Sequence, residues 1–200
     1  VTYSYYDASG KESTAGTTVF ARVKDNSGII DDIDTGISSH VMGWGAKTNA
    51  EYDTMFETYA KIGLKYLRID AYWNQAETVK GTYSIPEHWL RIVNSAVKNG
   101  LEPIVIINGI ENELYKDDTL AVRAQAFASY AAQVVSAMPS VKYVECINEY
   151  NLTGAAADYA VILRAFHAAV KGVRSNINVI AGNVSNHGGN YLQQMAAADS

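Results

Sequence analysis

Three polar residues near the end of one apolar stretch could do chemistry together: Glu145, Asn148 and Glu149, in VKYVECINEYN at residues 141–151. The Val, Tyr, Cys and Ile residues of this stretch favour a buried strand. Side chains alternate along a strand, so Glu145 and Glu149 share one face and Asn148 lies on the other. The carboxyl ends of parallel strands carry the catalytic groups of α/β barrels. The stretch therefore predicts a catalytic acid, or a solvated acid that ends a strand.

A second charged residue, Arg68, lies inside the apolar stretch LKYLRID at residues 64–70. A cation buried in a strand needs a carboxylate partner, because an unpaired buried charge is very costly. Glu145 and Asp70 are the candidate partners. The pair is either a structural ion pair or part of the same site as Glu149.

Further candidates for binding a ligand lie where predicted strands end or loops begin. Aromatic rings stack on the apolar faces of sugars, although each ring could equally pack in the core. Asparagine and histidine side chains at strand ends can hydrogen-bond a ligand or their own loop. These candidates are Trp44, Trp73, Asn108, Tyr150, Asn183 and His187.

The elements that position these residues alternate regularly from residue 40 onward. Five strand–helix units spaced by about 35 residues predict a parallel sheet with right-handed crossovers. A doubly wound sheet could close with five strands, whereas a (β/α)₈ barrel needs eight strands and usually about 250 residues. The sequence has no GxGxxG after the first predicted strand and no GxxxxGK[ST], so the nucleotide-binding motifs that would favour the open sheet are missing. The predicted strands are 40–46, 64–70, 101–108, 141–149 and 177–185, and the helices 49–62, 86–100, 118–138, 156–174 and 191–198.

Residues 1–39 differ from this alternation. VTYSYYD and TTVFARVKD are typical of strands, and the turn-rich ASGKESTAG separates them. Residues 28–39 are polar and predict a loop. We therefore expect residues 1–39 to be a β-hairpin extension, or the tail of an upstream β-domain, and residues 40–200 to be the main domain.

The composition excludes several classes of function. A net charge of -5 with no basic run argues against nucleic acid binding. The single cysteine, Cys146, cannot form an internal disulfide, and no apolar stretch is long enough to span a membrane. His40, His88 and His167 lack metal-ligand spacing, and nothing in the sequence implies a cofactor or a metal.

Three motifs, LRIDAYWNQAETVKGTYS (67–84), AVKNGLEPIVIIN (96–108) and VECINEYN (144–151), resemble glycoside hydrolases of clan A, above all family 39 and its relatives. In that clan an Arg lies on the second strand, and an Asn-Glu pair that belongs to an E-x-x-N-E run ends the fourth. A loop of the type W-x-x-x-E-x-x-x-G-x-Y follows the second strand. The matching residues are Arg68, Trp73, Glu77, Gly81, Tyr83, Glu145, Asn148 and Glu149.

The resemblance implies that the chain holds about the first five βα units of a (β/α)₈ barrel. Such a barrel would hydrolyse β-linked oligo- or polysaccharides with retention of the anomeric configuration. Glu149 would be the acid/base, Asn148 would bind the sugar 2-hydroxyl, and Arg68 would support the nucleophile. The clan's nucleophile ends the seventh strand, and Tyr150 stands where the family commonly has Pro. We therefore expect the chain to be inactive alone, with its exposed edges covered by a missing carboxyl-terminal half or a second copy.

Two alternatives of other classes remain. One is a non-catalytic carbohydrate-binding or scaffold protein derived from such a barrel. The other is an open-sheet domain for a small phosphorylated ligand, which a non-sequential strand order would favour.

Two N-x-[ST] sequons, at Asn151 and Asn183, fall at predicted strand ends over the site. A glycan on Asn151 would obstruct Glu149, so we expect neither asparagine to be glycosylated. This fits a bacterial protein, placed by the resemblance outside the cell or in its envelope.

Overall fold

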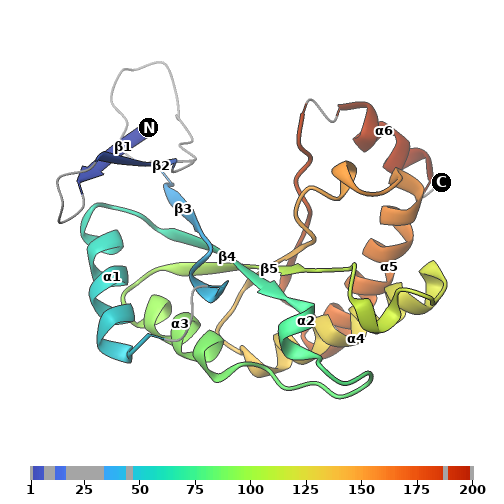
Figure 1. Cartoon of the computed structure of the whole chain (residues 1–200), viewed down its shortest axis with the longest axis horizontal. Helices are drawn as coiled ribbons and strands as arrows, with labels where there is room; N and C mark the ends of the chain where they lie inside the picture. The colour runs from blue at the N-terminus through green and yellow to red at the C-terminus, as the bar shows by residue number, and fades with distance from the viewer. Residues whose placement is uncertain (1, 7–11, 17–33, 44–46, 187–188, 199–200) are drawn as a thin grey trace.

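The structure is a computed structural model that describes residues 2–6, 12–16, 34–43, 47–186 and 189–198. Trp44, His187 and the strand predicted over residues 17–25 lie outside the described residues. The described ranges form a two-stranded hairpin and a five-stranded sheet with helices packed on one side of it (Figure 1).

The sheet is parallel throughout, and its strands follow one another in chain order from β3 to β7. A doubly wound sheet reverses its strand order at a switch point, whereas a barrel keeps sequential neighbours. The sequential order therefore agrees with the barrel and not with the open-sheet alternative. The strands are β3 (Gly36–Ser39), β4 (Tyr66–Tyr72), β5 (Glu102–Asn108), β6 (Tyr143–Cys146) and β7 (Asn178–Ala181).

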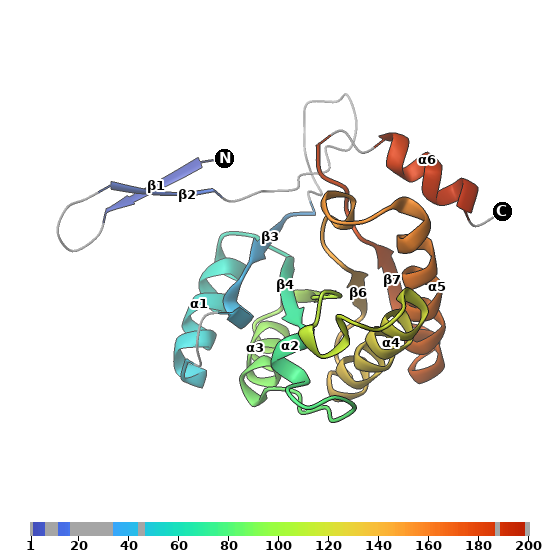
Figure 2. The ribbon, with the colours of Figure 1, turned by 45° about the vertical axis from the view of Figure 1, so that its right-hand side comes forward.

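The connecting helices bury their apolar sides against the sheet, and Figures 1 and 2 show the opposite side of the sheet without a helical layer. The third helix, for example, buries Trp89, Ile92 and Val93, which share one face at helical spacing. The helices are α1 (Asn49–Lys61), α2 (Trp73–Ala76), α3 (Glu87–Lys98), α4 (Leu120–Ala137), α5 (Ala156–Val173) and α6 (Gly189–Ala198). Short 3₁₀ turns are η1 (Val41–Gly43), η2 (Glu113–Tyr115) and η3 (Tyr150–Leu152).

Local chemistry accounts for the ends of α1. Thr48 and Glu51 form a reciprocal capping box at its start, one residue before the predicted cap at Asn49. At its end Gly63 adopts a φ of 88°, a left-handed conformation that glycine tolerates without steric cost. These two signals fix where the chain enters and leaves the helical layer.

The prediction of a strand over residues 40–46 was wrong. The first strand of the sheet is β3, four residues earlier and inside the segment predicted as a polar loop, while residues 41–43 form η1. Gly36 pairs with Tyr66, and a Cβ on Gly36 would lie 2.9 Å from the Tyr66 Cβ. Close pairing with β4 therefore makes a strand of the short, serine-rich segment, which local β-propensity underrates.

The first strand of the predicted hairpin is confirmed, and the turn predicted over residues 8–16 was wrong in its second half. β1 (Thr2–Tyr6) pairs antiparallel with β2 (Glu12–Gly16), which lies in the stretch that we predicted as a turn. Backbone pairing with β1 sets this strand, and the composition of ESTAG does not reveal it.

Candidate functional site

The turn after β6 brings the Asn-Glu pair to the carboxyl edge of the sheet. The strand ends at Cys146, and Ile147 and Glu149 both adopt left-handed conformations, with φ of 58° and 53°. Simple alternation would put Asn148 on the face opposite Glu145. The bend instead brings the Asn148 Oδ1 to 2.8 Å from Nη2 of Arg68, which also binds Glu145.

Arg68 joins β4 to β6 through a forked contact with Glu145. Its Nε donates to Oε2 at 2.8 Å and its Nη2 donates to Oε1 at 2.6 Å. The two side chains are 18% and 5% exposed, so the pair is largely desolvated and depends on this two-point geometry. Of the two partners predicted for Arg68, Glu145 is the one that makes the ion pair.

The charges around Arg68 keep its guanidinium firmly protonated. Burial by itself lowers the pKa of Arg68, but the hydrogen bonds and the charge of Glu145 outweigh it and raise the pKa above its usual value. The carboxylates of Asp70 and Glu149 add to this rise. Glu149 is therefore close enough to share the field of the Arg68–Glu145 pair.

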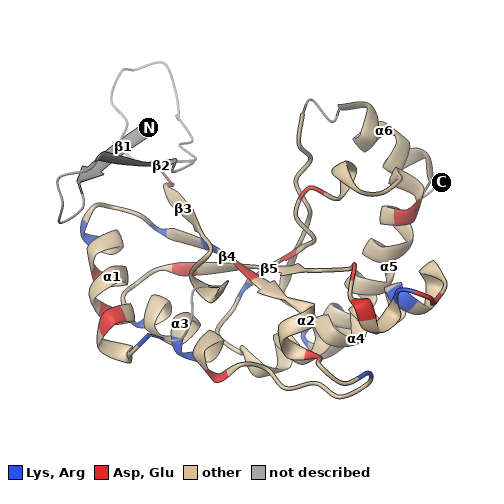
Figure 3. Ribbon diagram, viewed as in Figure 1, with Lys and Arg blue, Asp and Glu red and all other residues tan. Residues whose placement is uncertain are grey.

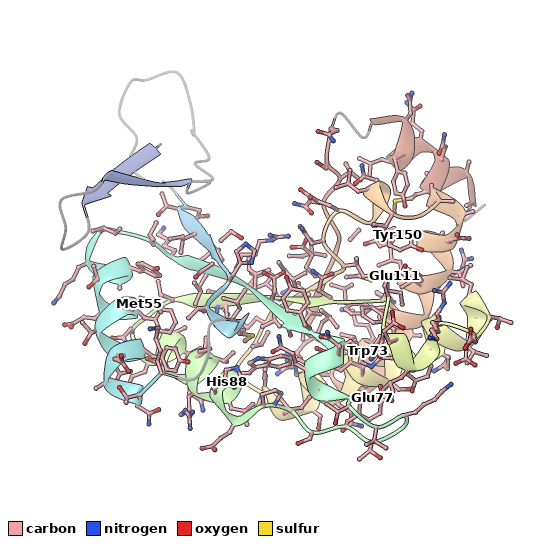
Figure 4. The ribbon with its side chains drawn as sticks, in the orientation of Figure 1. Met55, Trp73, Glu77, His88, Glu111 and Tyr150 are labelled. Atoms are coloured by element: carbon pink, nitrogen blue, oxygen red, sulfur yellow. The ribbon has the colours of Figure 1, made fainter. Side chains whose placement is uncertain are left out.

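Glu149 is half-buried and lines a cavity of about 240 Å³. Its backbone N–H donates to the Asn183 carbonyl at 3.1 Å, and no hydrogen bond within the described residues reaches its carboxylate. The carboxylate is thus free to meet a ligand. The cavity lies between the loops that follow β5 and β6, with Asn108, Glu111, Asn148 and Tyr150 among its lining residues. Figure 4 labels Glu111 and Tyr150 on these two loops.

A second polar cluster lies at the ends of β3, β4 and β5. The buried Asp70 carboxylate is 2.8 Å from the His40 Nδ1 and receives a hydrogen bond of 3.4 Å from the Asn108 Nδ2. The His40 side chain is 70% exposed. Sequence reasoning tested His40 only as a metal ligand and missed this pair, although Asp70 lies two residues beyond Arg68 on the same strand face.

The loop after β4 is a packed structure rather than a sugar platform. Trp73 is completely buried and stacks on Tyr115 and Tyr130, with ring centroids 4.8 and 6.1 Å apart. Because no part of its ring is exposed, a sugar has no access to it. The candidate role of Trp73 in substrate binding is therefore corrected to core packing.

Glu77 explains why this loop needs its motif residues. Its buried carboxylate accepts hydrogen bonds from the Trp73 Nε1, the Gly81 backbone N–H and the Tyr115 hydroxyl. Burial raises the pKa of Tyr115, and the hydrogen bond to Glu77 raises it further. Figure 4 shows Trp73 and Glu77 together at α2. The motif supplies the buried acceptor and two of its donors, and Tyr115 from outside the motif supplies the third.

The remaining candidates differ in how they reach the site. Tyr150 is only 7% exposed and stacks on Tyr159 at 5.5 Å, so its ring faces are largely used inside the protein. Asn183 is exposed and contacts the site through its backbone, whose N–H lies 3.5 Å from the Glu145 Oε1. Asn108 contacts the Asp70 pair and lines the cavity beside Glu149.

The described residues contain neither a candidate membrane span nor a candidate metal site. None of the helices has the length and hydrophobicity that a membrane span requires. No group of three His, Cys, Asp or Glu side chains in the described ranges could hold a metal ion. Acidic and basic residues are spread over helices and loops alike (Figure 3).

The fold is similar to that of solved glycoside hydrolases. A family 39 glycoside hydrolase from Bacteroides cellulosilyticus WH2 aligns with a TM-score of 0.63 and 24% identity over 74% of this chain and 31% of that one. The exo-β-1,4-mannosidase Op5Man5 from Opitutaceae bacterium strain TAV5 aligns with a TM-score of 0.60 and 16% identity over 90% and 33%. The endoglucanase Cel5A from Thermotoga maritima gives 0.55 and 21% over 71% and 47%.

No protein-family model matches the sequence, and a search of curated proteins finds no match. At these identities the structural matches show the fold, and this chain spans between 31% and 47% of the three solved chains. The chain therefore has the fold of part of a (β/α)₈ barrel similar to those of clan A glycoside hydrolases. The predicted fold class and resemblance are confirmed.

Proposed function

We propose that this chain is the amino-terminal part of a retaining glycoside hydrolase barrel that acts on β-linked glycans, with Glu149 as the acid/base. The observation that carries the proposal is the placement of Asn148 and Glu149. Both follow a central parallel strand at its carboxyl end, and Arg68 binds both Glu145 and Asn148. The structural neighbours, which include an exo-β-1,4-mannosidase and an endoglucanase, support a carbohydrate substrate.

The proposed chemistry assigns one task to each polar group. Glu149 protonates the leaving glycosidic oxygen and then activates water, a step that typically contributes ~10²–10⁴-fold. The Asn148 Oδ1 is occupied by Arg68, which leaves its Nδ2 to donate to a sugar hydroxyl. The carboxylates of Glu145 and Asp70 are held by Arg68 and His40.

The nucleophile of this reaction comes from outside the 200 residues. A retaining glycosidase needs a second carboxylate ~5–5.5 Å from the first, and Glu145 cannot leave its cation without exposing a buried charge. The chain alone is therefore inactive. The strands that carry the nucleophile, or a second copy of the chain, cover the open edges of β3 and β7.

Hydrolysis of a panel of aryl β-glycosides tests the proposal, with the intact mass measured on the same sample. We expect no turnover by the 200-residue chain alone and turnover by a larger polypeptide that contains it. Glu149→Gln abolishes hydrolysis of substrates with poor leaving groups, whereas Glu113→Gln, at a side chain 87% exposed, does not. Undiminished hydrolysis in Glu149→Gln would refute the role of Glu149.

One observation favours a second candidate function, a non-catalytic carbohydrate-binding protein. In the described part of the chain, the other acids of the site are already paired, Glu145 with Arg68, Asp70 with His40 and Glu111 with Arg123, so a second free carboxylate is missing there. Binding of an oligosaccharide without turnover by any larger form, and unaffected by Glu149→Gln, would establish this alternative.

A further inference from the structure

The turn that carries Asn148 and Glu149 is held in a costly backbone conformation. Ile147 and Glu149 both have φ in the left-handed region, at 58° and 53°. A β-branched residue such as Ile147 is a rare occupant of this region because its side chain crowds the backbone. Such conformations persist only where the surrounding structure imposes them. We therefore expect residues in contact with the turn to impose its left-handed conformation.

The first contact comes from the end of β7. The Gly182 N–H donates to the Tyr159 hydroxyl at 2.5 Å, and that hydroxyl donates to the Cys146 carbonyl at 2.6 Å. A Cβ on Gly182 would lie 1.9 Å from the Ile147 carbonyl oxygen and 2.4 Å from that of Cys146. Only glycine can approach the turn this closely without moving its backbone.

The next residues continue the contact along the turn. The Glu149 N–H donates to the Asn183 carbonyl at 3.1 Å. The Asn151 side chain forms two hydrogen bonds with the backbone of Ser185, one to its carbonyl and one from its N–H, both at 2.9 Å. The chain after β7 thus binds both ends of the strained turn.

We propose that the segment Gly182–Ser185, together with Tyr159 and Asn151, forms a clamp that imposes the left-handed turn and so positions Asn148 against Arg68 and Glu149 in its cavity. Tyr159, Asn151 and Gly182 are positioning residues, because none of them carries out a step itself. The functional meaning of the clamp rests on the proposed role of Glu149. The claim that the clamp imposes the backbone conformation of the turn does not depend on that role.

The test compares Asn151→Ala with Asn94→Ala, a matched change at an exposed position of α3, in the complete polypeptide. Asn151→Ala removes both bonds to Ser185, so we expect backbone amides in peptides covering 147–152 and 182–186 to exchange about tenfold faster. The Arg68 Nε–H resonance, identified by its loss in Arg68→Lys, shifts as well because Asn148 moves. Asn94→Ala changes neither signal.

Gly182→Ala is the stronger variant, since its Cβ collides with two carbonyl oxygens, and Tyr159→Phe removes the bridging hydroxyl while keeping the ring. Unchanged exchange and an unchanged Arg68 resonance in both Asn151→Ala and Tyr159→Phe would overturn the clamp. Both readouts are independent of hydrolysis. A failure of Glu149→Gln to affect turnover would therefore refute the proposed function and leave the clamp standing.

Discussion

Glu77 and Glu149 each follow a parallel strand at the same edge of the sheet, yet their surroundings are opposite. Glu77 is 1% exposed, and its carboxylate accepts hydrogen bonds from three donors. Glu149 is half-buried, lines a cavity and receives no side-chain hydrogen bond within the described residues. A carboxylate whose lone pairs are filled by the protein has nothing left for a ligand. The supply of donors, not the residue type, separates a structural acid from a candidate catalytic one.

The backbone around Glu77 and the backbone around Glu149 are also supported in different ways. Trp73, Tyr115 and Tyr130 pack around the Glu77 loop as stacked rings, so its order comes from the core. The Glu149 turn instead holds two left-handed residues that need outside support. The region around Glu77 therefore contributes stability through packing, whereas the turn at Glu149 holds backbone strain.

The largest effect that we expect is on stability, in Glu77→Ala. The change leaves the Trp73 indole N–H and the Tyr115 hydroxyl buried without an acceptor, and it also removes the acceptor of the part-buried Gly81 N–H. Each such group costs ~1–3 kcal/mol, so the free energy of unfolding should fall by about 4 kcal/mol in urea titrations. Glu113→Ala, at an exposed acid, should change it by less than about 0.5 kcal/mol. A loss of similar size in both variants would remove the contrast between the two regions.

Arg68→Met should cost about 3 kcal/mol of unfolding free energy, because it leaves the Glu145 carboxylate buried without a cation. Adding Glu145→Leu to this variant should restore part of the loss, since an apolar pair avoids the desolvation of two charges. A double-mutant cycle measured by urea unfolding checks both statements. No recovery in the double variant would mean that the pair contributes through its shape or through Asn148 instead.

High pH should weaken the Glu77 region selectively. Burial, then the hydrogen bond to Glu77, raises the pKa of Tyr115 in the folded state far above the unfolded value of ~10. The unfolded chain therefore loses this proton first, and stability that is fully present below pH ~10 declines as the pH rises through and beyond that value. Between pH 9 and 11 this single group should account for a loss of about 1.4 kcal/mol.

Tyr115→Phe is the control for this pH dependence. The variant loses the hydrogen bond to Glu77 at every pH, but its unfolding free energy should decline less steeply between pH 9 and 11. An equally steep decline in the variant would assign the effect to other tyrosines, such as the buried Tyr159 or the partly buried Tyr191, whose pKa is also raised by burial.

The sequence was sufficient to predict what depends on strand order and on charge. An arginine inside an apolar strand requires a carboxylate, and Glu145 is the partner that the structure provides. Alternation puts Asn148 on the face opposite Glu149, so the roles that the resemblance gives these two residues require a bend at the strand end, and the left-handed Ile147 supplies one. These inferences succeeded because each rests on a local rule with few solutions.

Other features depend on contacts between distant residues and were not predictable in this way. The β3 strand exists through its pairing with β4. Glu77 became a structural acid because Tyr115, 38 residues away in sequence, donates to it. A tryptophan after a strand looks the same in sequence whether it lines a cleft or fills the core, so Trp73 was placed wrongly.

The smallest stability effect should be that of Glu149→Gln, and it sharpens the comparison most. Because no donor in the described residues binds this carboxylate, replacing it by an amide should change the free energy of unfolding by less than about 0.5 kcal/mol. Glu77→Gln, which puts an amide donor among three donors, should cost several times more. Urea titrations of the two variants under identical conditions give the answer. Equal losses of unfolding free energy would make Glu149 a second structural acid. If Glu149→Gln leaves the unfolding free energy unchanged but abolishes hydrolysis in the larger polypeptide, Glu77 is the structural acid and Glu149 is the acid that contacts the substrate.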